Sequence, residues 1–485
     1  MSERSARREL ALGLLLGGGA GLTAVALSAA SGLRNVLAFT IAAVLVAAAW
    51  WMLNGASRWV MVFLGMALLL PPLPLALGNA GPHPSLFAAA IGVWAGLARL
   101  GAWTLRRRSI ALALVSLTAV LLLSIPMAAI YSGWRLAFES AARICLFLIS
   151  VYSFFYLADG PGRELPPEWL VRLLFHTGAF GAIFACLDFY FQFPAPVRFA
   201  EQFVWLPGGV FRRAQGVFYE ASTLGVFCVF LLVMLAAVAV LKLGPALRLT
   251  SAWLLTGGTV ILAALVLSFS RAAMVSLVVS LGALLWLERE NLRIVRTVIR
   301  LVFLALAGIL AGGAALYAFL PAFLTAYVER FWYSGVYLLE SPNLILSRRL
   351  ESWGFLISYL HEHPWQAVVG IGYKTLPYTG YLGRPVVADN MYLSLLIETG
   401  VLGLVSLLAL HFAVLVSTYR WVKSSQRSGQ NDMRRLFGLW LFAFWCGFAV
   451  QMSSGDVLTY WRVLAAIVAA LAVGVREAEN ANSVS

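Results

Sequence analysis

The sequence predicts an all-α protein, a polytopic bundle of transmembrane helices, and two observations carry that prediction. Hydrophobic residues make up 61% of the 485 residues and charged residues only 12%. Soluble domains are roughly 45–50% apolar and about 25% charged. The apolar residues also fall into blocks of about 17–24, long enough for a helix to cross a hydrocarbon core about 30 Å thick. The chain is therefore expected to cross a membrane many times.

We expect about fourteen spans, with an error of one or two. The first block follows Arg4–Arg8 and is too long for a signal peptide, so we interpret it as a membrane anchor. The four cysteines lie in different blocks without CxxC spacing, which favours apolar packing over disulfides or metal binding. The expected spans are residues 10–30, 33–53, 59–78, 85–105, 110–130, 139–158, 169–191, 218–241, 250–268, 272–287, 299–320, 391–417, 436–452 and 457–475.

Basic residues predict the orientation of these spans. With the N-terminus inside, alternation places the arginine-rich short segments Arg106–Arg108, Arg289–Arg300 and Arg420–Arg435 on the cytoplasmic side. Both termini, including a tail at 476–485, are then cytoplasmic. The net charge of +14 is explained by this topology and by attraction to anionic headgroups, so we do not expect nucleic-acid binding.

Two polar segments are too long to be simple turns, and both are predicted to lie outside. Residues 192–217 contain three prolines that prevent a continuous helix. Residues 321–390 form the longest loop, and loops beyond about 12–15 residues in compact proteins are usually functional or disordered. The chain then divides into eleven spans over 1–320, this periplasmic loop, three spans over 391–475 and the tail.

The long loop is expected to contain an amphipathic helix that lies on the membrane surface or caps the bundle. Apolar side chains recur at spacings of four and three residues, which places them on one helical face. His363-Pro364 should end this helix, and Gly370-Ile371-Gly372 should allow a tight turn. The apolar positions are Leu346, Leu350, Trp353, Ile357 and Leu360.

Five arginines in three outer segments are candidate anion ligands. Arg271 lies in the tight turn between two spans, where it either snorkels to the interface or faces a cavity. The pairs Arg212–Arg213 and Arg348–Arg349 are either solvated or part of the same site. A planar guanidinium donates two parallel hydrogen bonds and keeps its charge, so a converging set suits a lipid-linked pyrophosphate.

Three polar residues around the twelfth span need a reason. Asp389 and Asn390 open it, which fits helix capping, an anion site at the helix N-terminus, or both. Glu398 lies in an apolar run, where a carboxylate is costly unless it has a functional or structural partner. The histidines are too few and scattered for a metal site, so we expect no metal and no cofactor.

With these motifs in order, the chain resembles the O-antigen ligase and O-antigen polymerase superfamily of membrane glycosyltransferases. The resemblance covers about residues 205–417. The ligases of this superfamily carry a His-Asn-x9-Gly-x2-Gly pattern. In this sequence Asn390, Gly400 and Gly403 keep that spacing, and Asp389 stands in place of the histidine. The supporting segments are Arg213-Ala-Gln-Gly-Val-Phe, Ser270-Arg271-Ala, Arg349 through Trp353 with His363-Pro364 and Gly370–Gly372, and Asp389-Asn390-Met-Tyr-Leu.

The resemblance implies an activity, partners and roles. The expected reaction transfers a glycan from undecaprenyl pyrophosphate to a sugar hydroxyl at the periplasmic face of the bacterial inner membrane, without a metal. Asp389 and Arg271 are expected to be catalytic, and Arg212, Arg213, Arg348, Arg349, Asn390 and Glu398 to bind substrate. A flippase and a chain-length regulator are candidate partners.

The aspartate favours a polymerase for an exopolysaccharide, capsule or O-antigen. A ligase acting on lipid A core, and a transporter or flippase of lipid-linked oligosaccharide, are the alternatives. The absence of internal repeats and the large outer loop weigh against the transporter.

Overall fold

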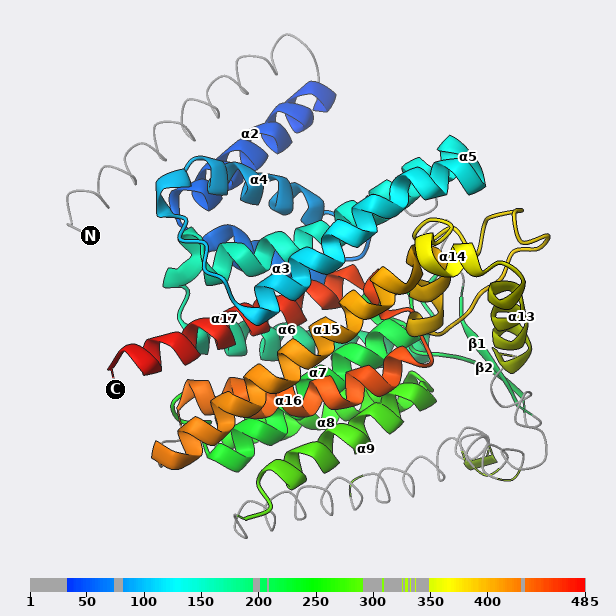
Figure 1. Ribbon diagram of the computed structural model, residues 1–485. Helices are drawn as coiled ribbons and strands as arrows, with labels where there is room; N and C mark the ends of the chain where they lie inside the picture. The colour runs from blue at the N-terminus through cyan, green and yellow to red at the C-terminus, as the bar shows by residue number, and fades with distance from the viewer. Residues whose placement is uncertain are drawn as a thin grey trace.

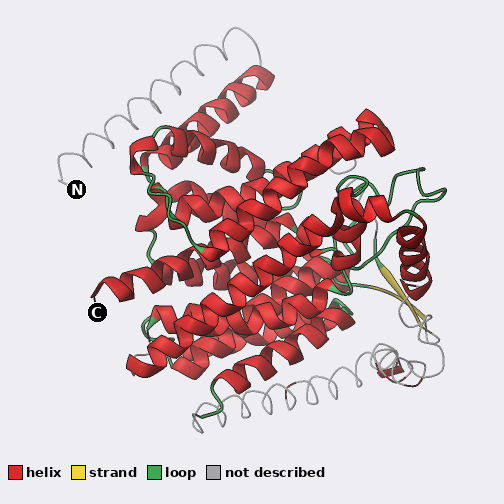
Figure 2. Ribbon diagram, in the orientation of Figure 1, coloured by secondary structure: helices red, strands yellow, loops and turns green. Residues whose placement is uncertain are grey.

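The computed structural model is mostly helical, which confirms the predicted all-α class (Figures 1 and 2). It describes residues 33–73, 82–194, 201–206, 209–290, 349–428 and 432–484, with isolated positions at 308, 325, 328, 329, 332 and 336. The first and eleventh predicted spans, and most of 321–348, lie outside the described residues. Among the described residues, one two-stranded hairpin accompanies the helices.

Several helices are apolar enough to make this a membrane protein. Five are long enough to cross a bilayer by length and composition, namely α5 (Ser109–Ala158), α6 (Pro167–Phe191), α7 (Ala221–Leu241), α15 (Met391–Ser428) and α16 (Met433–Met452). Shorter apolar helices include α3 (Arg58–Leu69), α4 (Ser85–Leu97), α8 (Ser251–Leu267) and α9 (Arg271–Leu287). Helices α2 (Leu33–Asn54) and α17 (Trp461–Val484) also belong to the described part of the bundle. The expected number of about fourteen spans stays a prediction.

Helix α5 is a hairpin of two limbs. A straight helix of 50 residues would be about 75 Å long. Yet Arg108, at its start, contacts Asp159, at its end, with 2.7 Å between Nη1 and Oδ1. The chain reverses at Gly133, whose φ of 83° and ψ of 162° are not helical. The two limbs correspond to the predicted spans 110–130 and 139–158.

Helix α15 also reverses, at Gly400, where φ is 72° and ψ is −172°. The hydroxyl of Tyr392 lies 3.3 Å from Nε2 of His411, although a straight helix would separate these residues by about 28 Å. The short limb 391–399 therefore folds back beside the long limb that follows Gly400. Asp389 and Asn390, which directly precede the short limb, consequently lie beside the long limb near the level of His411.

The turn Gly370–Gly372 closes the end of the short limb. Because the helix breaks at Gly400, the last carbonyls of the short limb lack helical donors. Ile371 N–H donates to the Ile397 carbonyl at 3.1 Å, and Gly372 N–H donates to that of Glu398 at 2.8 Å. A side chain on Gly370 would collide with the Glu398 carbonyl, which explains why a glycine stands there.

The predicted loop helix is present as α13 (Arg349–Glu362), and α14 (Pro364–Val369) follows it. Its buried face differs from the predicted one by about one residue. Leu356 and Tyr359 are buried, whereas Ile357 is 59% exposed. The buried pair packs on the returning loop, in a small core with Ile371, Leu376, Leu382, Val386, Ala388 and Ile397. Helix α13 packs on the returning loop and not on a single flat surface. Its buried face is therefore rotated relative to the predicted apolar face.

The segment 192–217 contains a β-hairpin that the sequence did not predict, formed by β1 (Phe203–Leu206) and β2 (Gly209–Arg212). Figure 1 shows β1, β2, α13 and α14 together at one end of the bundle, which we call the α13 end. The C-terminus lies at the other end, which we call the C-terminal end.

Candidate functional site

The candidate site lies at the α13 end, where Arg349 and Asp389 meet. Arg349 Nη2 and Nε approach the same oxygen, Asp389 Oδ2, at 3.1 and 3.2 Å. Trp353, one turn along α13, donates its indole N–H to the Ala388 carbonyl at 2.6 Å. The helix thus holds the backbone immediately before Asp389 as well as its carboxylate.

Asn390, and not Asp389, caps α15. Asn390 Oδ1 accepts hydrogen bonds from the backbone N–H groups of Tyr392 and Leu393 at 3.1 and 3.2 Å. Asp389 has a φ of 45°, in the left-handed region that aspartate tolerates better than most residues. That conformation turns its carboxylate away from the helix and toward Arg349. Of the two roles weighed for this pair, capping falls to Asn390.

Arg271 and Arg213 are positioned by the turn between α8 and α9. Arg271 is the first residue of α9, directly after the N-cap Ser270, whose hydroxyl accepts from Ala273 N–H. Arg213 Nε donates to the Ser268 carbonyl at 2.8 Å, and Ala214 N–H donates to the Leu267 carbonyl. The loop that follows β2 is therefore fastened to the carbonyls at the end of α8.

Three of the predicted arginines, Arg213, Arg271 and Arg349, lie close enough to influence one another electrostatically. Burial lowers the pKa of the Arg213 guanidinium, the charges of Arg271 and Arg349 lower it further, and Tyr460 and Glu220 oppose them. Arg271 and Arg349 also repel each other. The cluster thus gathers three positive charges, and perturbed charge clusters of this kind are typical of functional sites.

Acidic residues and a tyrosine border the cluster. Glu220 is the N-cap residue of α7, and its Oε2 accepts from the Thr223 hydroxyl at 2.7 Å. Tyr460 and Arg213 lie close enough to Glu220 to stabilise the negative charge of its carboxylate. Tyr460 precedes α17 and lies close enough to Glu220 and Asp389 to interact electrostatically with both carboxylates.

Lys374 and Asp456 form an ion pair beside this cluster that the sequence did not single out. Lys374 lies in the loop after the Gly370–Gly372 turn and is buried. Burial lowers the pKa of the Lys374 amine to about 8, and Glu398, Glu220 and Asp389 oppose this change. A lysine in a polar loop between prolines carries no signal of burial, so only the folded arrangement reveals it.

Two predicted ligands also have structural partners within the protein. Arg212 is only 3% exposed, and its Nη2 donates to the Phe193 carbonyl at 2.7 Å and to Asp188 Oδ1 at 3.3 Å. Glu398 Oε1 accepts from Leu376 N–H at 3.2 Å, which anchors the returning loop. Arg348 lies outside the described residues.

Within the described part of the chain, no group of three or more histidine, cysteine, aspartate and glutamate side chains is arranged to hold a metal ion. The cations at the candidate site are the side chains already described. The arrangement therefore offers fixed positive charge, the carboxylates of Asp389 and Glu220, each next to the start of a helix, and a buried amine.

One family model matches part of the chain. Residues 257–408 match the Wzy_C family model, described as O-antigen ligase, which confirms the resemblance drawn from the sequence. The match includes Arg271, Arg349 and Asp389, and it implies a glycosyltransferase-like enzyme in a membrane. No curated protein matches the chain.

Proposed function

We propose that this protein is a polysaccharide repeat-unit polymerase of the bacterial inner membrane. It transfers a growing glycan from undecaprenyl pyrophosphate to a sugar hydroxyl on a second lipid-linked repeat, at the periplasmic face and without a metal. The observation that carries the proposal is the convergence of Arg213, Arg271 and Arg349 from three separate segments, with Asp389 paired to Arg349.

The arginines suit the leaving group. As the acceptor oxygen bonds to the anomeric carbon, the bond to the pyrophosphate oxygen breaks and negative charge grows on that oxygen. Preorganised cations stabilise such charge most strongly in a site shielded from water. Arg271 at the start of α9 adds the positive end of a helix dipole to its own charge.

Asp389 suits the acceptor or the sugar. Arg349 engages Oδ2, so Oδ1 can accept a hydrogen bond from the attacking hydroxyl. The Arg349 guanidinium fixes this carboxylate in place as a hydrogen-bond acceptor and a negative charge. Asp389 therefore orients the acceptor, or stabilises positive charge on the sugar, and takes up the hydroxyl proton late in the reaction.

A ligase is the second candidate, because the matching family model is itself described as O-antigen ligase. Asp389 favours the polymerase, since the ligase pattern of the resemblance has a histidine at that position. The two functions differ only in the acceptor, so the acceptor decides between them.

The test uses the purified full chain in nanodiscs with a lipid-linked repeat unit and EDTA. A polymerase gives a ladder of glycan lengths from this substrate alone. Material that stays a single repeat until lipid A core is added identifies a ligase. A ladder that appears only when a divalent cation is restored refutes the metal-independent part of the proposal.

A further inference from the structure

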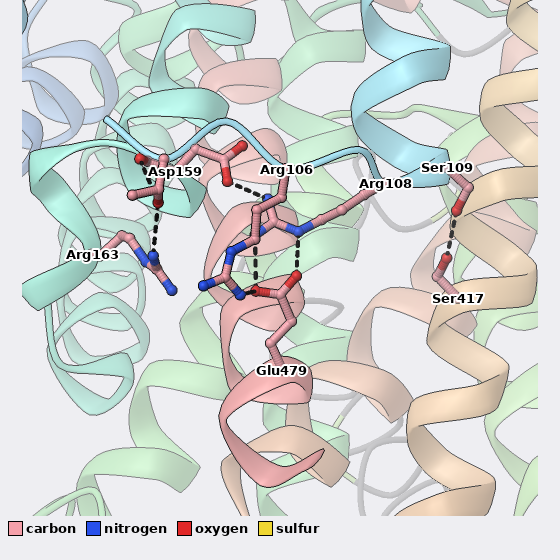
Figure 3. Close-up of polar contacts among 8 residues, drawn as sticks. Arg106, Arg108, Ser109, Asp159, Arg163, Ser417 and Glu479 are labelled. Carbon is pink, nitrogen blue, oxygen red and sulfur yellow. Dashed lines mark hydrogen bonds and ion pairs between the residues drawn. The ribbon is translucent and has the colours of Figure 1, made fainter. Parts of the chain in front are cut away.

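A basic cavity lies at the C-terminal end, away from the α13 end. It measures about 300 Å³ and is formed by the start of α5, the end of α15, the start of α16 and the end of α17. Its polar wall consists of Arg108, Ser109, Ser417, Arg420, Arg434 and Glu479. Figure 3 shows Ser109 on α5 facing Ser417 on α15, with Arg108 and Glu479 beside them.

One arginine of the wall is already neutralised. Arg108 Nη1 lies 2.7 Å from Asp159 Oδ1, and Nη2 lies 2.9 Å from Glu479 Oε2 (Figure 3). Glu479 also pairs with Arg106 at 2.9 Å. These contacts join α5 to α17. Because Glu479 is paired in this way, its negative charge does not neutralise the other arginines of the wall.

The other two arginines are not neutralised. No described residue accepts a hydrogen bond from Arg420 or Arg434. Arg434 Nε is buried and has no hydrogen-bond partner in the described part of the chain. A buried donor almost always has a partner, so this nitrogen on a cavity wall marks the place of a missing acceptor. The hydroxyls of Ser109 and Ser417, 3.3 Å apart, add donors on the same wall.

The surroundings indicate where the acceptor comes from. The segments Arg106–Arg108 and Arg420–Arg435 belong to the loops that the sequence predicts to be cytoplasmic. Ile110, Trp421 and Val475 form an apolar wall next to the arginines. A phospholipid supplies both parts that this wall needs. Its phosphate can bind the guanidinium groups, and its apolar body can pack on the apolar residues.

We propose that this cavity binds the phosphate of an anionic phospholipid of the inner leaflet. Arg420 and Arg434 hold the phosphate, and the serine hydroxyls hydrogen-bond to it. The bound lipid then links α15 and α16 to the α5–α17 pair. This site is independent of the proposed glycan transfer, because it lies at the other end of the bundle and shares no residue with it.

The test measures thermal unfolding of the full chain in nanodiscs of phosphatidylcholine, with or without 30% phosphatidylglycerol. Phosphatidylglycerol should raise the unfolding temperature, and native mass spectrometry should show bound lipid. Arg420→Gln or Arg434→Gln should each weaken this binding roughly fivefold, and the double variant roughly twenty-five-fold. Arg107→Gln removes an exposed charge near the same end that does not line the cavity, and it should leave binding unchanged.

Further arms separate the sources of phosphate. Inorganic phosphate is added to the phosphatidylcholine nanodiscs. Stabilisation by phosphatidylglycerol alone supports the lipid. Equal stabilisation by inorganic phosphate, lost in the double variant, reassigns the site to a soluble anion and overturns the lipid. If Arg107→Gln reduces the stabilisation as much as Arg434→Gln does, the lipid is attracted by general surface charge. That result overturns the proposal of a binding site in the cavity.

Discussion

Arg349 and Asp389 meet through a single carboxylate oxygen, with two guanidinium nitrogens within 3.2 Å of Oδ2. The neighbouring Asn390 supplies the cap of α15, so the two residues at the helix opening perform separate tasks. Their roles can therefore be tested separately, by stability at one position and by activity at the other.

The first prediction separates capping from catalysis. Asn390→Ala removes the oxygen that accepts from Tyr392 and Leu393, which should cost about 1 kcal/mol of stability. Asn390→Asp keeps that oxygen and should cost much less. Asp389→Asn keeps the shape of the side chain and should leave stability nearly unchanged while it abolishes chain extension. Thermal unfolding and the glycan ladder measure the two effects.

A normal ladder from Asp389→Asn at normal protein level would contradict the role proposed for this carboxylate. Asp389→His is an informative companion, because the resemblance places a histidine there in the ligases. Some retained transfer by that variant would indicate that both side chains act on the acceptor in the same way.

The second prediction concerns the geometry of the cation at Arg271. If it binds pyrophosphate, Arg271→Lys should be nearly as damaging as Arg271→Ala, since an ammonium cannot donate two parallel hydrogen bonds. The measurement is the initial rate of transfer at saturating lipid-linked substrate. Arg135→Ala, at a position 90% exposed on the turn of α5, serves as the control and should keep full activity. Full activity of the lysine variant would leave Arg271 with only a general charge role.

The sequence predicted the site better where chemistry is local than where it depends on packing. The helix at 349–362 and its end at His363-Pro364 followed from spacing and from proline sterics. The reversal of α15 did not, because a glycine within an apolar run also occurs in straight transmembrane helices. The reason that α15 breaks at Gly400 is visible only in the structure, where the carbonyls of Ile397 and Glu398 accept hydrogen bonds from Ile371 and Gly372.

The same distinction applies to charged side chains. Arg212 and Arg213 are adjacent and chemically identical, so the same role was expected of both. Strand β2 directs Arg212 into the protein, where Asp188 binds it, and the chain then places Arg213 against Ser268. Lys374 and Asp456 are more than eighty residues apart, and no local pattern connects them.

The third prediction is a pH dependence of stability from Lys374. Its pKa is about 8 in the folded protein and near 10.5 when the chain is unfolded. Between these values the unfolded state binds more protons, so this group makes the folded protein more stable as pH rises from 8 to 10.5. The contribution is at most about 1.4 kcal/mol per pH unit.

Wild type and Lys374→Met should be compared by thermal unfolding at pH 7 and pH 9.5, because other groups titrate in this range and cancel in the difference. The stability of the wild type relative to the variant should increase at the higher pH. Parallel profiles would show that Lys374 keeps its proton throughout, with its pair Asp456 outweighing burial.

The last prediction concerns the contact between the Gly370 turn and the end of the short limb of α15. Both Gly370 and Gly400 have positive φ, and an added Cβ would meet the Glu398 carbonyl at one and the Val368 carbonyl at the other. These atoms are backbone, so neither can rotate away. Gly370→Ala and Gly400→Ala should each destabilise the protein by several kcal/mol, by strain and by loss of the hydrogen bonds to the short limb.

Gly354→Ala is the matched control, because Gly354 lies within α13 with no atom within 4 Å of an added Cβ. It should be neutral, or stabilising by up to about 1 kcal/mol through helix propensity. Thermal unfolding of the three variants decides the matter, and Gly400→Ala with wild-type stability would mean that α15 does not reverse at this residue.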